Sequence, residues 1–411
     1  MKMYYNFLNM LLCIYIFLFI ALPITSKYKV VGLNIHVVLN ILMIYYVSGI
    51  ILNKEIRNRS INSVIRFFKN KCNIVLSFCV IWMIFSVTYS ADKVSAISEI
   101  VMYMKYLFIY FLIEDQTHNK RYIDNILNSF IFTLIVVSIV TFIDTLKGIG
   151  IEQTAEGVNR IRVESLLENS NNLGAFFILF IFPFIMLSIY EKEKRKKYLY
   201  IIISILCLFN IIVSYSRNAW MAFGAGCLLI VIIYNKKFIV PFLGVFLIGL
   251  LIPEISIRLT EFNDFSQNVT RIKLWETALL MIKEHALLGV GVGNFSYQYD
   301  KYIKRFEELK YADYPIFHPH NVFLQVQAEL GIIGTILIIS LIIFIIIKIK
   351  KYIRETSSSL HKNFYRGFYI SFIVFIFIMN MLDDFFSAPK IILIFIVIIS
   401  IPINSKEPEV M

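Results

Sequence analysis

Long apolar runs follow one another along almost the whole chain, and they constrain its fold more than any other feature. A run of about 20 apolar residues matches the hydrocarbon core of a bilayer, and a chain with many such runs crosses the membrane repeatedly as helices. Of the 411 residues, 58% are hydrophobic and only 17% are charged, whereas soluble domains carry roughly 25% charged residues. The sequence therefore predicts an all-α polytopic membrane protein with one integral membrane domain over residues 1–411.

Twelve membrane spans are predicted from these runs. They lie near residues 4–24, 30–52, 73–89, 94–113, 122–146, 173–190, 198–215, 218–234, 238–253, 329–347, 367–382 and 391–403. The first run exceeds the roughly 7–15 apolar residues of a cleaved signal peptide, so we expect it to remain as a span.

The distribution of Lys and Arg in the short loops predicts the orientation. Segments 53–72, 191–197 and 348–366 hold six, five and six of these residues, whereas the turns at 25–29 and 90–93 hold two and one. The positive-inside rule then places the three basic segments and both termini in the cytoplasm. We therefore expect a cytoplasmic-membrane protein with two extracytoplasmic loops, a smaller one at 147–172 and a large helical one at 254–328.

Most of the net charge of +12 lies in the short loops, because the 254–328 segment holds eight basic and nine acidic residues. No zinc-ligand spacing, Walker lysine or RNA-binding aromatic motif occurs, so nucleic acid is not an expected partner. All cysteines except Cys72 lie inside apolar runs, which argues against a disulfide framework. Anion binding outside the membrane must therefore come from individual arginines.

The large loop contains the pattern of an amphipathic helix over residues 269–285. Its apolar residues Ile272, Trp275, Leu279 and Ile282 recur at intervals of three and four, which predicts a helix lying along the membrane surface. Glycines at 289, 291 and 293 follow, and we expect them to end this helix and allow a tight reversal.

A second helix is predicted to start near Pro319, since proline suits the first turn of a helix. In that helix His320, Leu324 and Gln327 would share one face. His320 could then face the same cavity as the arginines of the outer loops.

Four arginines are candidates for holding an anion, because the planar guanidinium grips phosphate oxygens through two parallel charge-assisted bonds. Arg217 lies in the turn between two spans at the expected outer face, although an arginine there can also reach toward lipid headgroups. Arg271 lies near the start of the amphipathic helix, where a solvated helix face is the alternative. Arg160 and Arg162 lie two residues apart in the smaller outer loop, where one of them can be mere surface charge.

His318 and His320 precede the predicted tenth span. A histidine has the unperturbed pKa of about 6.5 that suits proton abstraction, although a cap or surface role is the alternative for either ring. Glu307, Glu308 and Asp313 are available as further ligands, but the outer loops offer no third ligand cluster of comparable quality, so no metal site is expected. Other charged residues in or beside spans either line a cavity or serve the structure: Glu99, Lys105, Asp383 and Asp384.

Four motifs then occur in a fixed order: SRNAW at the start of a span, RIKLWETA, EHALLGVGVGNF, and HPHNVFLQVQAELGIIG. Together with the large loop between spans, they resemble the O-antigen ligase and O-antigen polymerase superfamily over roughly residues 160–345. Ala286 stands where that family often has proline. Members of this superfamily are helical membrane glycosyltransferases that pass a glycan from a polyprenyl diphosphate carrier to an acceptor hydroxyl at the outer face.

The resemblance implies that Arg217 and Arg271 hold the diphosphate and that His320 activates the acceptor, without metal or cofactor. Further substrate contacts are expected at Arg160, Arg162, His318 and Asn321. The implied partners are the lipid-linked glycan, an acceptor glycan or lipid, the membrane and other polysaccharide-assembly proteins. No nucleic acid is implied.

Two activities share this site. The Ile-, Lys- and Asn-rich composition indicates an AT-rich genome and a source without lipopolysaccharide, which favours a polymerase of surface polysaccharide repeat units. The alternative is a ligase that moves finished glycan to a lipid or protein acceptor. A transporter of lipid-linked sugars is a third reading, but it predicts charged or broken spans at mid-membrane instead of an outer cluster.

Overall fold

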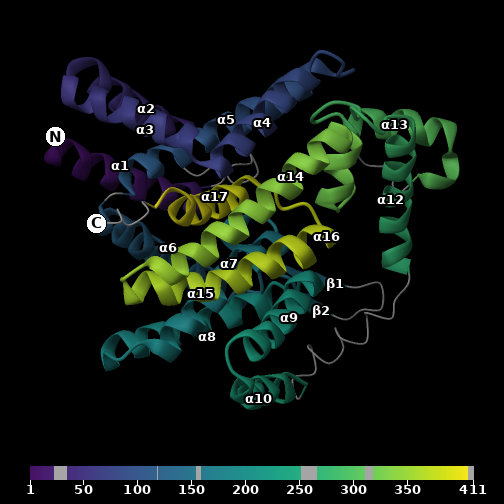
Figure 1. The fold of residues 1–411 in the computed structure, drawn as a ribbon. Coiled ribbons are helices and arrows are strands. Elements are labelled where there is room, and N and C mark those ends of the chain that lie inside the picture. Colours follow the sequence, from purple (N-terminus) through teal and green to yellow (C-terminus); the bar gives the residue numbers. More distant parts are fainter. Residues whose placement is uncertain (23–34, 118, 154–158, 251–265, 311–317, 406–411) are drawn as a thin grey trace.

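The computed structural model describes residues 1–22, 35–117, 119–153, 159–250, 266–310 and 318–405, which form a bundle of helices (Figure 1). The helices in the predicted spans are α1 (Lys2–Ala21), α2 (Ile35–Leu52), α4 (Lys71–Ser86), α5 (Lys93–Gln116), α6 (Lys120–Leu146), α7 (Ser170–Tyr190), α8 (Lys194–Val213), α9 (Arg217–Ile233), α10 (Ile239–Leu250), α14 (Val322–Glu355), α15 (Ser359–Val374) with α16 (Asn380–Leu382), and α17 (Pro389–Asn404). In the described part, strand is confined to the antiparallel pair β1 (Ile151–Gln153) and β2 (Asn159–Ile161). The all-α prediction is confirmed.

Among the described helices, seven are long and apolar enough to cross a bilayer. They are α1, α5, α6, α7, α8, α14 and the continuous α15–α16 segment. The pair α2 and α3 (Lys54–Lys69), bent by 112°, makes an eighth candidate, and α4, α9 and α17 are apolar but shorter. The polytopic class is confirmed, whereas the count of twelve spans stays a prediction.

The prediction of a basic loop at 53–72 is wrong, because most of it forms α3. Asn53 starts the helix by accepting hydrogen bonds from the backbone N–H groups of Glu55 (2.9 Å) and Ile56 (3.1 Å), which the first turn of a helix leaves unpaired. Ser63 then donates to the buried Asp115 Oδ1 at 2.6 Å. Lys and Arg in this segment therefore lie on a helix that packs against α5.

The core is centred on α7, which packs against α8 and α15. Its sequence is apolar on all sides, as expected for a helix surrounded by other helices. Gly367 of α15 allows close contact, since a Cβ at this position would lie 2.1 Å from the Phe182 carbonyl oxygen. Asn169 caps the first turn of α7, so a rigid helix carries the polar residues that follow it.

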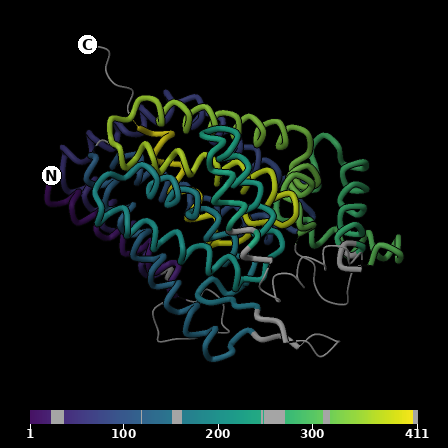
Figure 2. The backbone as a smooth tube through the Cα atoms, turned by 90° about the horizontal axis from the view of Figure 1, so that it is seen from below, coloured from purple at the N-terminus to yellow at the C-terminus, as the bar shows by residue number. Residues whose placement is uncertain are grey.

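The segment predicted as the large extracytoplasmic loop contains α12 (Ser266–Glu284) and α13 (Phe295–Arg305), at the end of the bundle opposite the N-terminus (Figures 1 and 2). The helix predicted at 269–285 is therefore present. Its position relative to the membrane surface stays a prediction, as do the bounds of both outer loops.

The face of α12 that packs against the protein is not the apolar face predicted to lie along the membrane. Leu274, Ala278 and Met281 are buried against α13 and α14, whereas Ile272 and Leu279 are 40% and 53% exposed. Both faces carry apolar residues, so periodicity alone does not tell which face packs against the protein. The contacts with α13 and α14 decide it.

The glycine-rich segment after α12 is held against α14 by backbone hydrogen bonds. Gly289, Gly291 and Gly293 all have positive φ, and α14 is broken at Gly331, where φ is 65° and ψ is −166°. These bonds run from Val290 N to Ala328 O (2.9 Å), Gly291 N to Glu329 O (2.8 Å) and Ile332 N to Ala286 O (3.0 Å). The predicted tight reversal is confirmed. Its backbone carbonyl and amide groups form hydrogen bonds with the backbone groups of α14 that lose their helical partners at the break.

The buried side chain of Glu329 adds two hydrogen bonds to this contact between α14 and the glycine-rich segment. Its carboxylate accepts the backbone N–H of Gly293 (2.9 Å) and of Phe295 (3.1 Å), the first residue of α13. A carboxylate at the N-terminus of a helix pairs with amide groups that otherwise stay unbonded. The motifs EHALLGVGVGNF and HPHNVFLQVQAELGIIG are therefore halves of one structure that fixes the α12–α13 segment to the long helix α14.

Candidate functional site

The HPHN segment forms a tight turn before α14. Asn321 caps the helix, since its side-chain oxygen accepts the backbone N–H of Phe323 (3.0 Å) and Leu324 (3.1 Å). The helix therefore begins at Val322, and the prediction of a start near Pro319 is wrong. His320 lies outside the helix with φ of 53°.

The shared helical face predicted for His320, Leu324 and Gln327 is accordingly wrong too. The positive φ of a non-glycine residue costs roughly 1–3 kcal/mol and persists only where the surroundings hold it in place. Two contacts hold the turn: Trp275 Nε1 of α12 donates to the Pro319 carbonyl at 3.1 Å, and the His320 backbone N–H donates to His318 Nδ1 at 3.3 Å.

The turn aims His320 at Asp383, which follows α16. His320 Nδ1 lies 2.8 Å from Asp383 Oδ1. The carboxylate is itself held in place, because Asn171 Nδ2 donates to Oδ2 at 3.1 Å and the Asp384 N–H donates to Oδ1 at 2.9 Å. Three segments far apart in the sequence thus fix one imidazole.

The electrostatics of this pair favour an ionised carboxylate. Burial raises the pKa of Asp383, but the hydrogen bond from His320 and the electrostatic interactions with the two histidines and Arg271 outweigh burial, so the pKa lies below its ordinary value. An ionised carboxylate only accepts, and His320 Nδ1 therefore carries its hydrogen. The other ring nitrogen, Nε2, is left as a proton acceptor.

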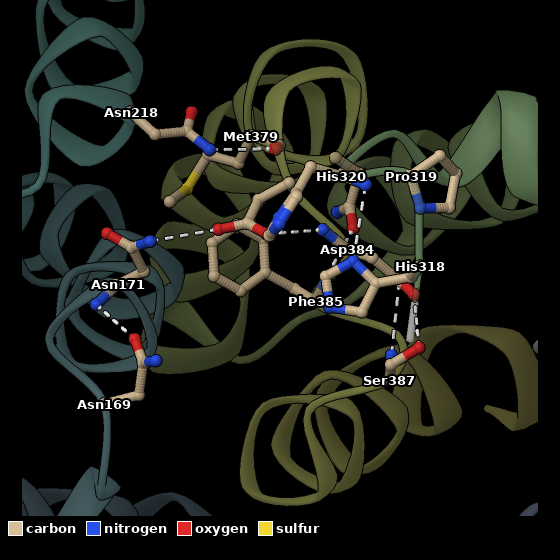
Figure 3. Close-up of polar contacts among 12 residues, drawn as sticks. Asn169, Asn171, Asn218, His318, Pro319, His320, Met379, Asp384, Phe385 and Ser387 are labelled. Atoms are coloured by element: carbon tan, nitrogen blue, oxygen red, sulfur yellow. Dashed lines mark hydrogen bonds and ion pairs between the residues drawn. The ribbon is translucent and has the colours of Figure 1, made fainter. Parts of the chain in front are cut away.

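His318 packs against the same pair, its ring edge-on to that of His320 with centroids 4.5 Å apart. Burial lowers the pKa of His318, and the charge of His320 lowers it further, while Asp384 and Asp383 act in the opposite direction. Burial likewise raises the pKa of Asp384, whose carboxylate pairs with Ser387 (Figure 3). His318 is therefore a neutral neighbour that shapes the turn.

His318, His320 and Asp383 each offer a ligand atom, and the three atoms lie within 4.8 Å of one another. Asp383 is the third ligand that the outer loops did not offer in the sequence. Such a group could hold a divalent cation, but Nδ1 of each histidine already takes part in a hydrogen bond. The absence of a metal stays a prediction.

Three of the predicted arginines lie on or just before helices that contact the segments carrying His320 and Asp383. Arg217 is the half-buried first residue of α9, and the next residue, Asn218, donates to the Met379 carbonyl at 2.9 Å (Figure 3). Arg271 lies one turn before Trp275, and its charge lowers the pKa of Asp383.

Arg162 contacts the start of α7. Its Nε donates to Ser170 Oγ at 2.7 Å, directly before the asparagine that binds Asp383. Arg160 belongs to β2, but its side chain lies outside the described residues.

A polar cavity of about 830 Å³ opens beside His320. Polar lining residues come from the start of α5, the start of α7, α13 and the segment after α16, and they include Ser95, Asn169, Asn171, Ser296 and Asp300. Glu99, Asp383 and Asp384 also line it, as the sequence suggested for charged residues beside spans. The volume lies within the roughly 300–1,000 Å³ of ligand sites.

A second cavity of about 200 Å³ adjoins it and is apolar. It lies between α4, α5, α14 and α17, and Glu99, Gln325 and Asp384 line both cavities. A molecule with a polar head and an apolar tail matches this pair of cavities.

Comparison with known proteins agrees with the sequence motifs. Residues 202–339 match the family described as O-antigen ligase. That segment of the chain is similar to O-antigen ligases. A Rickettsia conorii protein with the provisional name polysaccharide ligase is 28% identical over 44% of this chain. The match spans 44% of that protein, less than half of its length.

The resemblance to the ligase and polymerase superfamily is thereby confirmed, and both comparisons name ligases. The matched O-antigen ligase segment includes Arg217, Arg271 and His320, whereas Arg162 and Asp383 lie outside it. The sequence reading missed the pairing of Asp383 with His320 and the role of Asn171. No local motif marks either residue, because both act across a large sequence separation.

Proposed function

We propose that the protein is a membrane glycosyltransferase of the ligase type, which moves a glycan from a polyprenyl diphosphate carrier to an acceptor hydroxyl. The main support is the geometry of His320: one ring nitrogen binds an ionised carboxylate at 2.8 Å, and the ring lines a polar cavity. That arrangement suits a general base. The ligase now replaces the polymerase as the favoured reading, because the comparisons name ligases.

In the proposed reaction the acceptor hydroxyl lies in the polar cavity, and His320 Nε2 removes its proton. The oxygen forms a bond to the anomeric carbon of the donor glycan. The bond from that carbon to the diphosphate oxygen breaks, and the diphosphate leaves with the electron pair. Asp383 stabilises the imidazolium that forms, as a carboxylate does when it orients a catalytic histidine.

Arg217 and Arg271, with Arg162 as a further contact, bind the diphosphate and offset the charge that builds on it as it leaves. Guanidinium groups suit this role because they stay charged and make two-point contacts with phosphate oxygens. They lie on α9, on α12 and just before α7, and the charge of Arg271 acts on Asp383. The proposed chemistry needs no metal.

The proposed location is the outer face of the cytoplasmic membrane, with both termini in the cytoplasm. The distribution of Lys and Arg in the short segments supports this orientation. The apolar cavity between α4, α5, α14 and α17 can receive the tail of a lipid acceptor while the glycan of that acceptor stays in the larger cavity. Lipid-linked glycan and acceptor are thus the proposed partners, together with other polysaccharide-assembly proteins.

Purified protein in proteoliposomes, given a labelled glycan on polyprenyl diphosphate and a separate lipid acceptor, tests the proposal. Label that moves to the separate acceptor supports a ligase. A ladder of products on the carrier lipid instead indicates a polymerase. Label that crosses the bilayer unchanged indicates a transporter and contradicts glycan transfer.

A further inference from the structure

The polar cavity beside His320 has an unusually acidic lining. Seven carboxylates line it, from Asp92, Glu99, Glu168, Asp300, Glu329, Asp383 and Asp384. The basic side chains in the described lining are His318, His320 and Lys390. Acidic side chains therefore outnumber basic ones in the described lining, although burial raises the pKa of Asp384.

Several of these charges are fixed by the fold. Asp92 caps α5, and its hydrogen bonds with Ser95 hold its pKa below the ordinary value. Asp300, on α13, is exposed to the opening of the cavity. The ammonium group of Lys390 donates to the carbonyls of Ile20 (3.2 Å) and Leu166 (2.5 Å), and Glu168 is the lining carboxylate whose charge acts on it.

Uncharged hydrogen-bonding groups complete the lining. Asn169, Asn171 and Asn172 follow one another at the start of α7, and Ser95, Ser98 and Ser296 face them from α5 and α13. Amides, hydroxyls and carboxylates together suit a ligand rich in hydroxyl or amino groups, since carboxylates accept hydrogen bonds from such groups and repel anions. The arginines proposed for the diphosphate are not among the described lining residues.

We infer that this cavity is the acceptor subsite and that it selects a glycan whose reacting end is neutral or carries an amine. Sugars bearing a carboxylate or phosphate next to the reacting hydroxyl are rejected. The inference rests on the proposed function for the identity of the cavity's occupant. It divides the site into a cationic side for the leaving diphosphate and an anionic side for the acceptor.

Binding of three disaccharides to the full chain in nanodiscs tests this. The probes are the glucosamine dimer, its neutral N-acetylated form, and digalacturonic acid, each followed by saturation-transfer NMR with the His320→Ala variant as well as the unaltered protein. We expect the amine dimer to bind about tenfold more tightly than digalacturonic acid, as one unscreened charge contact provides. The neutral dimer should fall between them.

Asp300→Asn should reduce this preference, because it removes one carboxylate at the cavity mouth with no change in size. The matched control is Glu307→Gln, which neutralises an exposed carboxylate of the same outer segment outside the cavity lining. Equal or tighter binding of digalacturonic acid overturns the inference. So do the absence of saccharide binding and an equal effect of the two substitutions.

The result is separable from the proposed function, because binding requires no transfer. A charge preference without glycan transfer leaves the subsite standing and contradicts the proposed function. Equal transfer rates to acceptors of either charge would support the proposed function and contradict the charge preference of the subsite.

Discussion

Replacing Asp383 with Asn tests how His320 is held and polarised. The substitution keeps the size of the side chain, so the Asp384 N–H can still donate to the remaining oxygen, and Asn171 can turn its amide to donate or accept as needed. What is lost is the negative charge 2.8 Å from His320 Nδ1. The protein should therefore fold normally and react slowly.

The magnitude follows from the strength of that contact. A hydrogen bond to a charged group contributes about 1.5–3 kcal/mol, and each 1.36 kcal/mol of barrier changes a rate tenfold. If the contact is made fully only when His320 is protonated in the transition state, kcat should fall roughly 10- to 150-fold. KM for the acceptor should stay close to its original value, because ground-state binding does not use this charge.

The assay is single-turnover transfer of a fluorescent glycan from polyprenyl diphosphate in proteoliposomes, with thermal unfolding as the folding control. The double variant with His320→Ala completes a cycle: once the imidazole is gone, the Asp383 substitution should have no further effect. Unchanged kcat in Asp383→Asn would refute the reasoning. An equal loss in the presence and absence of His320 would refute it as well.

Four further results are expected. Arg217→Lys should lower the transfer rate by about tenfold, because lysine cannot form the two-point phosphate contact; Arg121→Lys on α6 is the control, and equal rates for the two variants contradict the role. Gly331→Ala should lower the unfolding temperature, because its Cβ would lie 2.2 Å from the Leu287 carbonyl oxygen, whereas Gly224→Ala meets no atom within 4 Å and should not. The pKa of Asp383 is lowered from 3.8, so the ionised carboxylate should stabilise the fold above pH 3.8, and this stabilisation should be lost as pH falls through the folded-state pKa. The difference in unfolding free energy between Asp383→Asn and the original protein should therefore shrink only in that acidic range. In a cysteine-free background, Tyr297→Cys should react with a membrane-impermeant maleimide on intact cells and Glu193→Cys only after permeabilisation; the reverse pattern would contradict the orientation.

The sequence was sufficient to predict the membrane class, the positions of the apolar helices and the glycine reversal after α12. These features depend on local composition and backbone freedom, both of which can be read without tertiary contacts. The start of α14 was also readable, since Asn321 is a strong N-cap residue. Giving weight to Pro319 instead put the helix start in the wrong place.

Other features depend on contacts that no local pattern reveals. The face of α12 that packs against the protein could not be assigned from the sequence, because apolar residues occur on both of its sides. Asp383 is 63 residues from His320, and its pairing arises from how α16 packs near the HPHN turn. Sequence reading identified Asp383 as a costly charge beside a span, yet only the fold shows what it contacts.

The most direct test of the central claim is the single-turnover transfer rate of His320→Ala, measured with saturating lipid-linked donor and beside His361→Ala. His361 is a buried histidine bonded to Tyr352 and Asp124, away from the polar cavity. If His320 is the base, its removal should slow transfer by about 10²–10⁴-fold, with donor binding and protein abundance preserved, and His361→Ala should keep the rate per folded molecule. An undiminished rate in His320→Ala would contradict the account.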